Sequence, residues 1–159
     1  MKKLSKESEI NDYVWRIFPN HLNSRGTAFG GFIISLLDQV AVIIADRHSR
    51  QTCVTASIDA VHFLSPIKMG DVLIIQGKVN RSWTSSLEIG MKITAEETIS
   101  CHRRHVLSAY FTFVALDSQG KPTSVPELIL CTEEEKRRFE EAELRRAQRI
   151  STTKQKKKN

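Results

Sequence analysis

Asp38 is the residue whose type and position in this sequence most suggest chemistry. It lies within the longest apolar run of the chain, Phe29 to Ala45, which a helix would make apolar almost all round. The few polar residues are three or four positions apart, so Ser35, Asp38 and Gln39 fall with Gly31 along one narrow seam. Because a carboxylate is costly to bury unless it is paired or reacts, Asp38 is the first candidate catalytic residue.

The junction before this helix offers a second chemical feature, the pair Gly30-Gly31. A helix N-terminus has unpaired N–H groups and a partial positive charge, and glycine lets a ligand carbonyl approach the backbone closely. Such a junction can polarise a thioester or ester carbonyl. Asp38 lies about two turns further along, too far to reach the same carbonyl within one chain. If two chains pair, Asp38 of one would face the junction of the other, with Asn23 orienting a water molecule.

A structural interpretation of the same residues is equally open at this point. Gly30 and Gly31 would then allow tight packing of the helix on a sheet, and Asp38 would make only a buried polar contact.

Other reaction chemistries are not indicated by the sequence. The five histidines are scattered over different expected elements, and no HExxH, CxxC, GxSxG or P-loop pattern occurs. The three cysteines, Cys53, Cys101 and Cys131, are odd in number and widely separated, which predicts free thiols in a reducing cytosol. We therefore expect no metal, no cofactor and a cytoplasmic protein.

Composition predicts one soluble globular domain, with 159 residues, 40% hydrophobic and 26% charged. The apolar run is too short and too polar to span a membrane, and the N-terminus lacks the features of a signal peptide. Of the net charge of +6, the segment from Thr132 onward holds +4. The remaining mild basic excess suits an anionic small molecule and gives no reason to expect nucleic acid.

The elements that must position these residues follow from hydrophobic periodicity. A helix from Phe32 to about Arg50 precedes segments in which apolar and polar residues alternate, as in antiparallel strands. One long helix is the only cover available for their apolar face, which predicts an α+β fold with an antiparallel sheet wrapped round one central helix. The expected strands are residues 13–18, 54–60, 72–79, 87–96 and 104–116.

The expected domain organisation has four parts. Residues 1–12 are a flexible lead-in, residues 13–130 form the domain, residues 131–150 form a C-terminal helix and residues 151–159 form a basic disordered tail. Thr132 followed by three glutamates is typical of a helix start. This helix has few apolar residues, which predicts an exposed helix or an arm that faces a partner.

Three motifs in order resemble the hotdog-fold acyl-CoA thioesterases. They are HLNSRGTAFGGFIISLLDQVA at residues 21–41, VTASIDAVHFLSPIKMGD at residues 54–71, and the DSQGKP turn at residues 117–122 followed by Pro126. The resemblance covers about residues 13–127 and is closest to the small cytosolic acyl-CoA hydrolases of broad chain-length range.

The resemblance implies an enzyme that hydrolyses acyl-CoA, with coenzyme A as the substrate carrier. It implies that Asp38 is the general base or nucleophile, that Asn23 assists from the partner subunit, and that Gly31, beside Gly30, supplies a backbone N–H to the thioester oxygen. It also implies dimers with a continuous sheet, often assembled as three dimers in a hexamer, and active sites at the dimer interface.

Further residues are candidates for contacts with the substrate. The segment Arg81 to Ser86 lies where relatives contact the pantetheine or nucleotide part of CoA, and polar side chains of the strand after the helix could line an acyl tunnel. An equally ordinary interpretation is that these polar side chains are solvated or lie between subunits. The full set of substrate-binding candidates is Gly30, Thr55, Ser57, Phe63, Arg81, Thr84, Ser85, Arg103 and Arg104.

Some residues depart from the family pattern, and one rival function remains open. His21, Ser24-Arg25 and Trp83 differ from the usual residues, which affects the shape of the entrance and the acyl preference. The rival is a non-catalytic acyl-CoA-binding regulatory module. A hydratase on the same fold would use a histidine with its acid on the helix, and this helix has none before His48.

Overall fold

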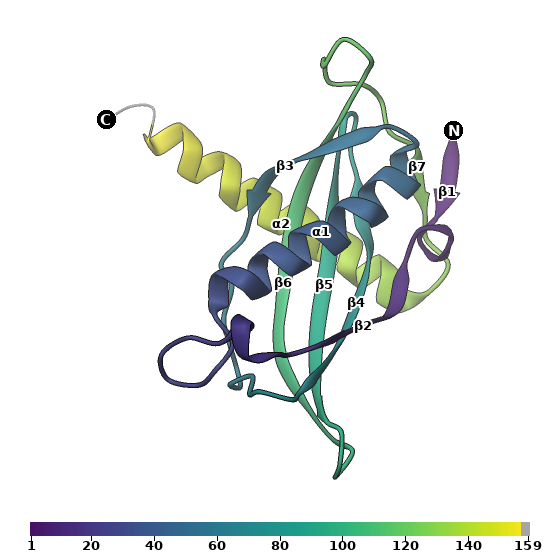
Figure 1. Ribbon diagram of the computed structural model, residues 1–159. Coiled ribbons are helices and arrows are strands. Elements are labelled where there is room, and N and C mark those ends of the chain that lie inside the picture. Colours follow the sequence, from purple (N-terminus) through teal and green to yellow (C-terminus); the bar gives the residue numbers. More distant parts are fainter. Residues whose placement is uncertain (157–159) are drawn as a thin grey trace.

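A five-stranded antiparallel sheet lies between two helices in the computed structural model, which describes residues 1–156 (Figure 1). The strand order is β2-β4-β5-β6-β3, and a separate parallel pair joins β1 to β7. The elements are β1 (Lys2–Leu4), β2 (Ile10–Arg16), α1 (Gly30–Ser49), β3 (Thr52–Ile58), β4 (Val72–Ser82), β5 (Ser86–Glu97), β6 (His102–Leu116), β7 (Glu127–Ile129) and α2 (Glu133–Lys156). The predicted α+β fold, a sheet wrapped round a central helix with a second C-terminal helix, is confirmed.

Helix α1 packs on the inner face of the sheet and forms the centre of the core. Its last turn carries Arg47 and His48, and Arg50, in the left-handed conformation at φ 58°, closes it with an N–H bond to the carbonyl of Asp46. The helix buries one side only, through Ile33, Leu36, Leu37, Val40, Ala41, Ile44 and Ala45. Within a single chain Gly31, Ser35, Gln39 and Ile43 are exposed, so one side of this largely apolar helix is left uncovered.

The long strands β5 and β6 follow the predicted alternation. Leu87, Ile89 and Ile93 of β5 face α1, and Phe111 and Phe113 of β6 face it beside them, all with no exposed surface. The strands pair in antiparallel register, with Ile89 opposite Phe111. This face of the sheet is apolar enough to bury one side of α1, which is why the two elements pack.

Strand β3 is an edge strand, and its apolar residues are not covered. Val54 is 44% exposed and Ile58 is 39% exposed, although Cys53 beside them is buried. One side of β3 pairs with β6, and the other side pairs with no strand of the described chain. A register shift between Thr55 and Ser57 marks a bulge in this strand.

The N-terminal residues are held to the body of the protein, unlike the flexible lead-in expected for residues 1–12. Strand β1 pairs with β7, the Ser5 hydroxyl donates to the Val79 carbonyl at 3.1 Å, and β2 begins at Ile10. Polar residues make these contacts, which is why the apolar periodicity gave no sign of them.

Helix α2 crosses the outer face of the sheet and ends beyond the β3 edge (Figure 1). The predicted capping by Thr132 is confirmed, because its hydroxyl accepts from the Glu135 N–H at 3.1 Å. The helix runs on to Lys156, so residues 151–156 of the expected tail are helical and residues 157–159 lie outside the described part. The expectation of a fully exposed helix was wrong, since Ala142 is fully buried and Arg145 bonds to the buried Glu88, whereas a partner-facing role of α2 stays a prediction.

Neither described helix is long and apolar enough to cross a membrane. The three cysteines form no disulfide, as predicted.

Candidate active site

The side chain of Asp38 lies beside the free edge of the sheet. It is half-buried on α1, and its Oδ1 accepts a hydrogen bond of 2.7 Å from the hydroxyl of Thr55, which is exposed on β3. Among the described side chains, those of residues 1–152, Thr55 is the one hydrogen-bond donor to this carboxylate. The bond fixes the carboxylate and leaves its second oxygen available to a substrate or a water molecule.

Gly30 and Gly31 form the first two positions of α1, and Gly31 is exposed. A Cβ placed on Gly31 would lie 2.7 Å from the ring of Phe29, and one placed on Gly30 would lie 3.5 Å from the ring of Phe63. The nearest atoms at both positions belong to aromatic side chains rather than to the sheet. The alternative that these glycines allow tight packing of the helix on the sheet is thus not what the structure shows.

A cavity of about 310 Å³ opens beside the helix start. It lies between the loop that precedes α1 and the loop that follows β3, and Gly30, Phe63, Leu64 and Ile67 are among its lining residues. Phe63 and Leu64 are 46% and 62% exposed, so the cavity presents apolar surface to solvent. Two predicted substrate-binding residues, Gly30 and Phe63, therefore meet at one cavity.

Arg104 supports the wall of this cavity. Its guanidinium donates to the carbonyl of Pro66 at 2.9 Å and forms a salt bridge with Asp71, whose carboxylate also accepts from the Lys68 N–H. Arg104 is thereby held by contacts within its own chain, and its predicted contact with the substrate stays a prediction. Arg103, its neighbour, is exposed and pairs with Glu96 at 2.5 Å.

Asn23 organises its own loop within one chain. Its Oδ1 accepts from the N–H groups of Arg25 and Thr27 at 2.9 and 3.3 Å, and its Nδ2 donates to the Thr27 hydroxyl at 3.0 Å. No hydrogen bond joins Asn23 to Asp38 in residues 1–156. The structure of a single chain does not bring these two predicted catalytic residues together.

The remaining predicted contacts divide by location. Ser57 follows Thr55 on β3 and is half-buried at the bulge. Thr84 and Ser85 form the turn between β4 and β5, and their carbonyls accept from Val125 and Ala115. That turn follows Val79, whose carbonyl accepts from the Ser5 hydroxyl. Lys3, close to Ser5 in sequence, donates to the carbonyl of Arg47, which places this end of β4 near the C-terminal end of α1. Within one chain the turn therefore lies at the opposite end of the sheet from Gly30 (Figure 1).

Arg81 and Trp83 hold helix α2 rather than lining the cavity. Arg81 donates to the carbonyl of Phe139 at 3.1 Å and pairs with Glu143 at 3.0 Å. The Trp83 indole N–H donates to Glu143 at 2.9 Å, and the guanidinium of Arg146 lies 4.8 Å from the Trp83 ring. The expected role of Arg81 in binding CoA finds no support within one chain.

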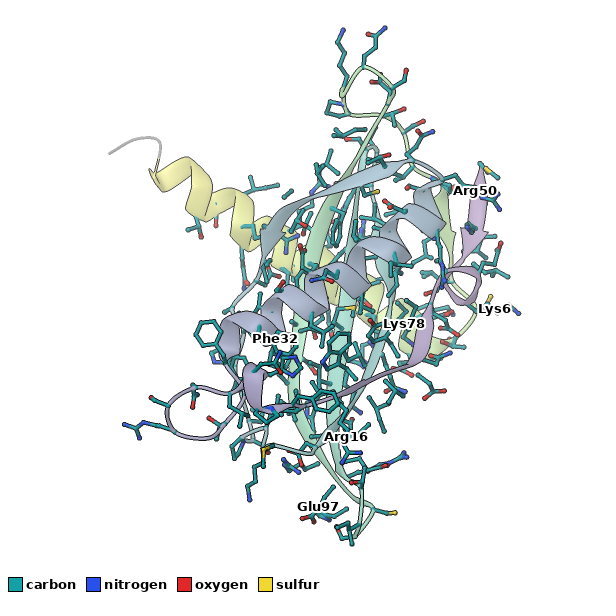
Figure 2. All side chains as sticks on the ribbon, in the orientation of Figure 1. Lys6, Arg16, Phe32, Arg50, Lys78 and Glu97 are labelled. Carbon is teal, nitrogen blue, oxygen red and sulfur yellow. The ribbon has the colours of Figure 1, made fainter. Side chains whose placement is uncertain are left out.

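Hydrophobic periodicity did not predict an aromatic cluster beside the start of α1. Phe32 (Figure 2) stacks on the ring of His21, with centroids 4.3 Å apart, and the centroid of the Trp15 ring lies 6.2 Å from that of Phe32. His21 also accepts the Phe18 N–H at 3.0 Å through Nδ1. The unusual His21 is thus a packed ring that shapes the loop before the helix.

Two buried groups, His48 and Cys53, have shifted pKa values and structural roles. Burial lowers the pKa of His48, whose ring contacts the Ser8 hydroxyl at 3.4 Å and the Pro126 carbonyl at 3.3 Å. Burial likewise raises the pKa of the Cys53 thiol to about 11, so this thiol is a poor nucleophile at neutral pH. Residues 1–156 contain no group of three or more side chains placed to hold a metal ion.

Comparison with known sequences places the chain among thioesterases. The family model of the thioesterase superfamily matches residues 25–102. An uncharacterized acyl-CoA thioester hydrolase of Bacillus subtilis is 41% identical over 133 residues, which are 84% of this chain and 77% of the relative. The rat cytosolic acyl coenzyme A thioester hydrolase is 40% identical over 125 residues, 77% of this chain but 33% of that protein.

Solved structures give the same result. The acyl-CoA hydrolase of Bacillus cereus has a TM-score of 0.93 at 40% identity, covering 99% of this chain and 96% of the other. The acyl-CoA hydrolase of Staphylococcus aureus, solved with butyryl coenzyme A and coenzyme A, has a TM-score of 0.88 at 34% identity, covering 99% and 98%. A hexameric acyl-CoA thioesterase has a TM-score of 0.92 at 31% identity, covering 96% and 97%.

Three variants of the Staphylococcus aureus enzyme were also solved, with an asparagine, an aspartate and a threonine each replaced by alanine. In that sequence these residues are separated by 15 and 17 positions. The same separations join Asn23 to Asp38 and Asp38 to Thr55.

Proposed function

This chain belongs to the thioesterase superfamily of acyl-CoA hydrolases, and we propose that it converts acyl-CoA to a free acid and CoA at a site completed by two subunits. The observation that carries this proposal is the carboxylate of Asp38, held by Thr55 beside the free edge of β3. The numbers of sequence positions from Asn23 to Asp38 and from Asp38 to Thr55 equal those between the three residues replaced in the Staphylococcus aureus enzyme. This agreement supports the assignment of Asp38 as a catalytic residue.

The reaction needs a nucleophile for the thioester carbonyl and a donor for the oxygen that becomes negative. Asp38 acts either as the general base that takes a proton from water or as the nucleophile itself. The N–H of Gly31 donates to the oxyanion, and Asn23 positions the water. The carbon–sulfur bond then breaks, and the CoA thiolate leaves and takes up a proton.

The open edge of β3 supports a dimer. An exposed edge strand presents unpaired backbone groups, and pairing two such edges about a two-fold axis makes one continuous sheet. The exposed Val54 and Ile58 would be covered, and Asp38, bonded to the same strand through Thr55, would lie at the interface. Three such dimers form the proposed hexamer, in line with the hexameric relative.

Thioester hydrolysis by this arrangement requires a carboxylate, backbone donors and water. We therefore propose that the enzyme uses no cofactor and that CoA enters as the carrier of the acyl group. We further propose that it acts in the cytoplasm, in fatty acid metabolism, without a nucleic acid or membrane partner, since the rat relative is named a cytosolic enzyme.

The rival function is a regulatory module that binds acyl-CoA without hydrolysing it. Relatives with 38% to 41% identity are named acyl-CoA thioester hydrolases, which favours the enzyme. Ligand binding alone also gives no reason for a carboxylate held by Thr55 beside the free edge of β3.

The test is a panel of acyl-CoA substrates assayed by release of free thiol, with the wild type and Asp38→Asn. We expect kcat to fall at least a hundredfold in the variant, since asparagine keeps the shape but cannot act as base or nucleophile. Asp12→Asn, an exposed change on β2, is the matched control and should keep full activity. Full activity of Asp38→Asn on every substrate would exclude the mechanism. Thermal stabilisation by acyl-CoA with no thiol released by the wild type would favour the rival.

A further inference from the structure

A second cavity lies on the outer face of the sheet, on the opposite side from Asp38. It has a volume of about 320 Å³ and is bounded by β4, β5 and β6 below and by the N-terminal half of α2 at its side. The inner and outer faces are separate, because Gly77 of β4 faces Ile44 of α1 whereas Glu88 of β5 bonds to Arg145 of α2. A ligand in this cavity would therefore not touch the proposed catalytic residues of the same chain.

The floor of the cavity is hollow because of one glycine. The outward positions of β5 alternate through Glu88, Gly90 and Lys92, and Gly90 puts no side chain on the floor. A Cβ added there would lie 2.6 Å from the side-chain nitrogen of the buried Asn80. Asn80 donates to the buried Glu88 at 3.1 Å, so a larger residue at position 90 would have to displace a side chain that is itself hydrogen-bonded.

Four basic side chains surround this floor. Lys78 of β4 (Figure 2) and Lys92 of β5 rise from neighbouring strands, where Lys78 is opposite Gly90 and Gln76 is opposite Lys92. The two lysines are therefore diagonal neighbours on one face, about 7–8 Å apart at their backbones. Arg137 and Arg138 face the cavity from α2.

The acidic groups nearby compensate only part of this charge. Glu141 pairs with Arg137 at 2.6 Å and Glu134 pairs with the half-buried Arg138 at 2.6 Å, both within α2. The bond from Arg138, and to a smaller extent the charge of Lys78, lower the pKa of Glu134. Among the side chains of residues 1–152, Lys78 and Lys92 form no salt bridge and no side-chain hydrogen bond.

We propose that this cavity binds an anion that carries two or more phosphate groups, of about the size of a nucleotide. Ammonium and guanidinium groups that converge from two elements suit several phosphate oxygens at once, and the volume lies in the range of small-molecule sites. The polar side chains of Gln76 and Ser108 and the ring of Tyr110 also line the cavity and can contact the remainder of the ligand. Such an anion would join the sheet to α2.

The same chemistry has two sources, a free nucleotide or the phosphorylated adenosine end of a second CoA. Calorimetric titration of the full-length protein at low salt should use pyrophosphate, ATP and adenosine 3′,5′-bisphosphate, with uncharged adenosine as the reference. Tighter binding of the bisphosphate than of ATP and pyrophosphate would assign the site to CoA, and the reverse order would assign it to a free nucleotide; either supports the proposal.

The decisive variant is Lys78→Gln combined with Lys92→Gln, with Lys121→Gln in the exposed β6–β7 loop as the control. We expect the double variant to bind the best phosphate ligand at least tenfold more weakly and the control to bind it as the wild type does. The double variant should also lose the rise in melting temperature that the ligand causes. Absence of phosphate binding by the wild type, or equal binding by the double variant, would overturn the proposal. Because neither lysine belongs to the catalytic site, hydrolysis without added ligand should stay near the wild-type rate and report correct folding.

Discussion

Thr55 donates its hydroxyl proton to the carboxylate of Asp38 across 2.7 Å, which joins the central helix to the edge strand of the sheet. Most contacts between α1 and the sheet are apolar, so this bond gives the carboxylate an orientation that packing alone would not give. The bond also ties the position of Asp38 to whatever pairs with β3.

Replacement of Thr55 should reduce the rate of hydrolysis without unfolding the protein. Thr55→Val keeps the shape of the side chain and removes the bond, and we expect kcat to fall about tenfold while KM changes little. Thr55→Ser keeps the hydroxyl and should recover most of the rate. Steady-state kinetics with one acyl-CoA and both variants measure this, and equal rates for valine and serine would contradict the proposed role of the hydroxyl.

Two inactive variants should restore activity to one another if the site is shared between subunits. Asp38→Asn and Asn23→Ala damage opposite contributions to each site, so a mixed dimer holds one intact site. Random exchange of subunits should then return about a quarter of the wild-type activity. The proteins are dissociated together, reassembled and assayed by thiol release.

The matched control mixes Asp38→Asn with Thr55→Val, which act on the same side of the site. This mixture should gain no more activity than Thr55→Val alone supplies. If Asp38→Asn and Asn23→Ala also fail to recover activity after exchange is verified by mass, then Asn23 acts in the same subunit as Asp38.

Helix α2 should lose stability when its buried ion pair is broken. Arg145 donates two hydrogen bonds, of 2.7 and 3.1 Å, to Glu88, which has no exposed surface. Arg145→Ala leaves that carboxylate without its main partner and should lower the free energy of unfolding by about 3 kcal/mol. Arg149, 3.6 Å from Glu88, limits the loss. Urea denaturation measures it, and Arg137→Ala, at an exposed pair, should cost about 0.5 kcal/mol or less.

Acidification should destabilise the protein through His48. Burial holds its folded-state pKa below the ordinary value of 6.5, so the unfolded chain binds a proton first as the pH falls. The contribution of His48 is therefore complete above pH 6.5 and is lost as the pH falls from there towards the folded-state pKa. Urea denaturation at pH 7.5 and 5.5 should give a smaller pH effect for His48→Gln than for the wild type. The exposed His62→Gln should keep the wild-type effect, and an unchanged slope for His48→Gln would contradict this account.

The strands and the helix that form the core could be predicted from the spacing of their apolar residues. Apolar residues occur at every second position in the strands and recur along one side of the helix. Leu87, Ile89 and Phe111 belong to that group. Apolar and polar residues alternate in β3 as they do in β5 and β6, yet Val54 and Ile58 are exposed. Periodicity shows that one face of a strand is apolar, but it does not show what covers that face. A partner chain is invisible to that reasoning.

The docking of α2 could not be predicted for a different reason. Glu88 occupies an outward position of an alternating strand, which normally indicates contact with solvent. Its burial depends on Arg145, 57 residues later, and no local pattern announces such a pair. The candidate active site could be predicted only in part. The spacing along the helix identified Asp38 and Gly31, but Thr55, which bonds to Asp38, and Phe63, beside Gly30, lie on segments that follow the helix, and no local pattern placed them there.

The open edge of β3 has a consequence for the fate of an unassembled chain. The strand, TCVTASI, has no proline and no charge, and β-branched residues make up much of it. Natural edge strands usually carry a proline or a charged residue, which prevents pairing with other extended segments. Without either, the free edge of β3 favours aggregation until another chain pairs with it. Pairing of two subunits through β3 would then also protect the chain from aggregation. A substitution that separates the subunits would abolish activity and would also cause the protein to aggregate.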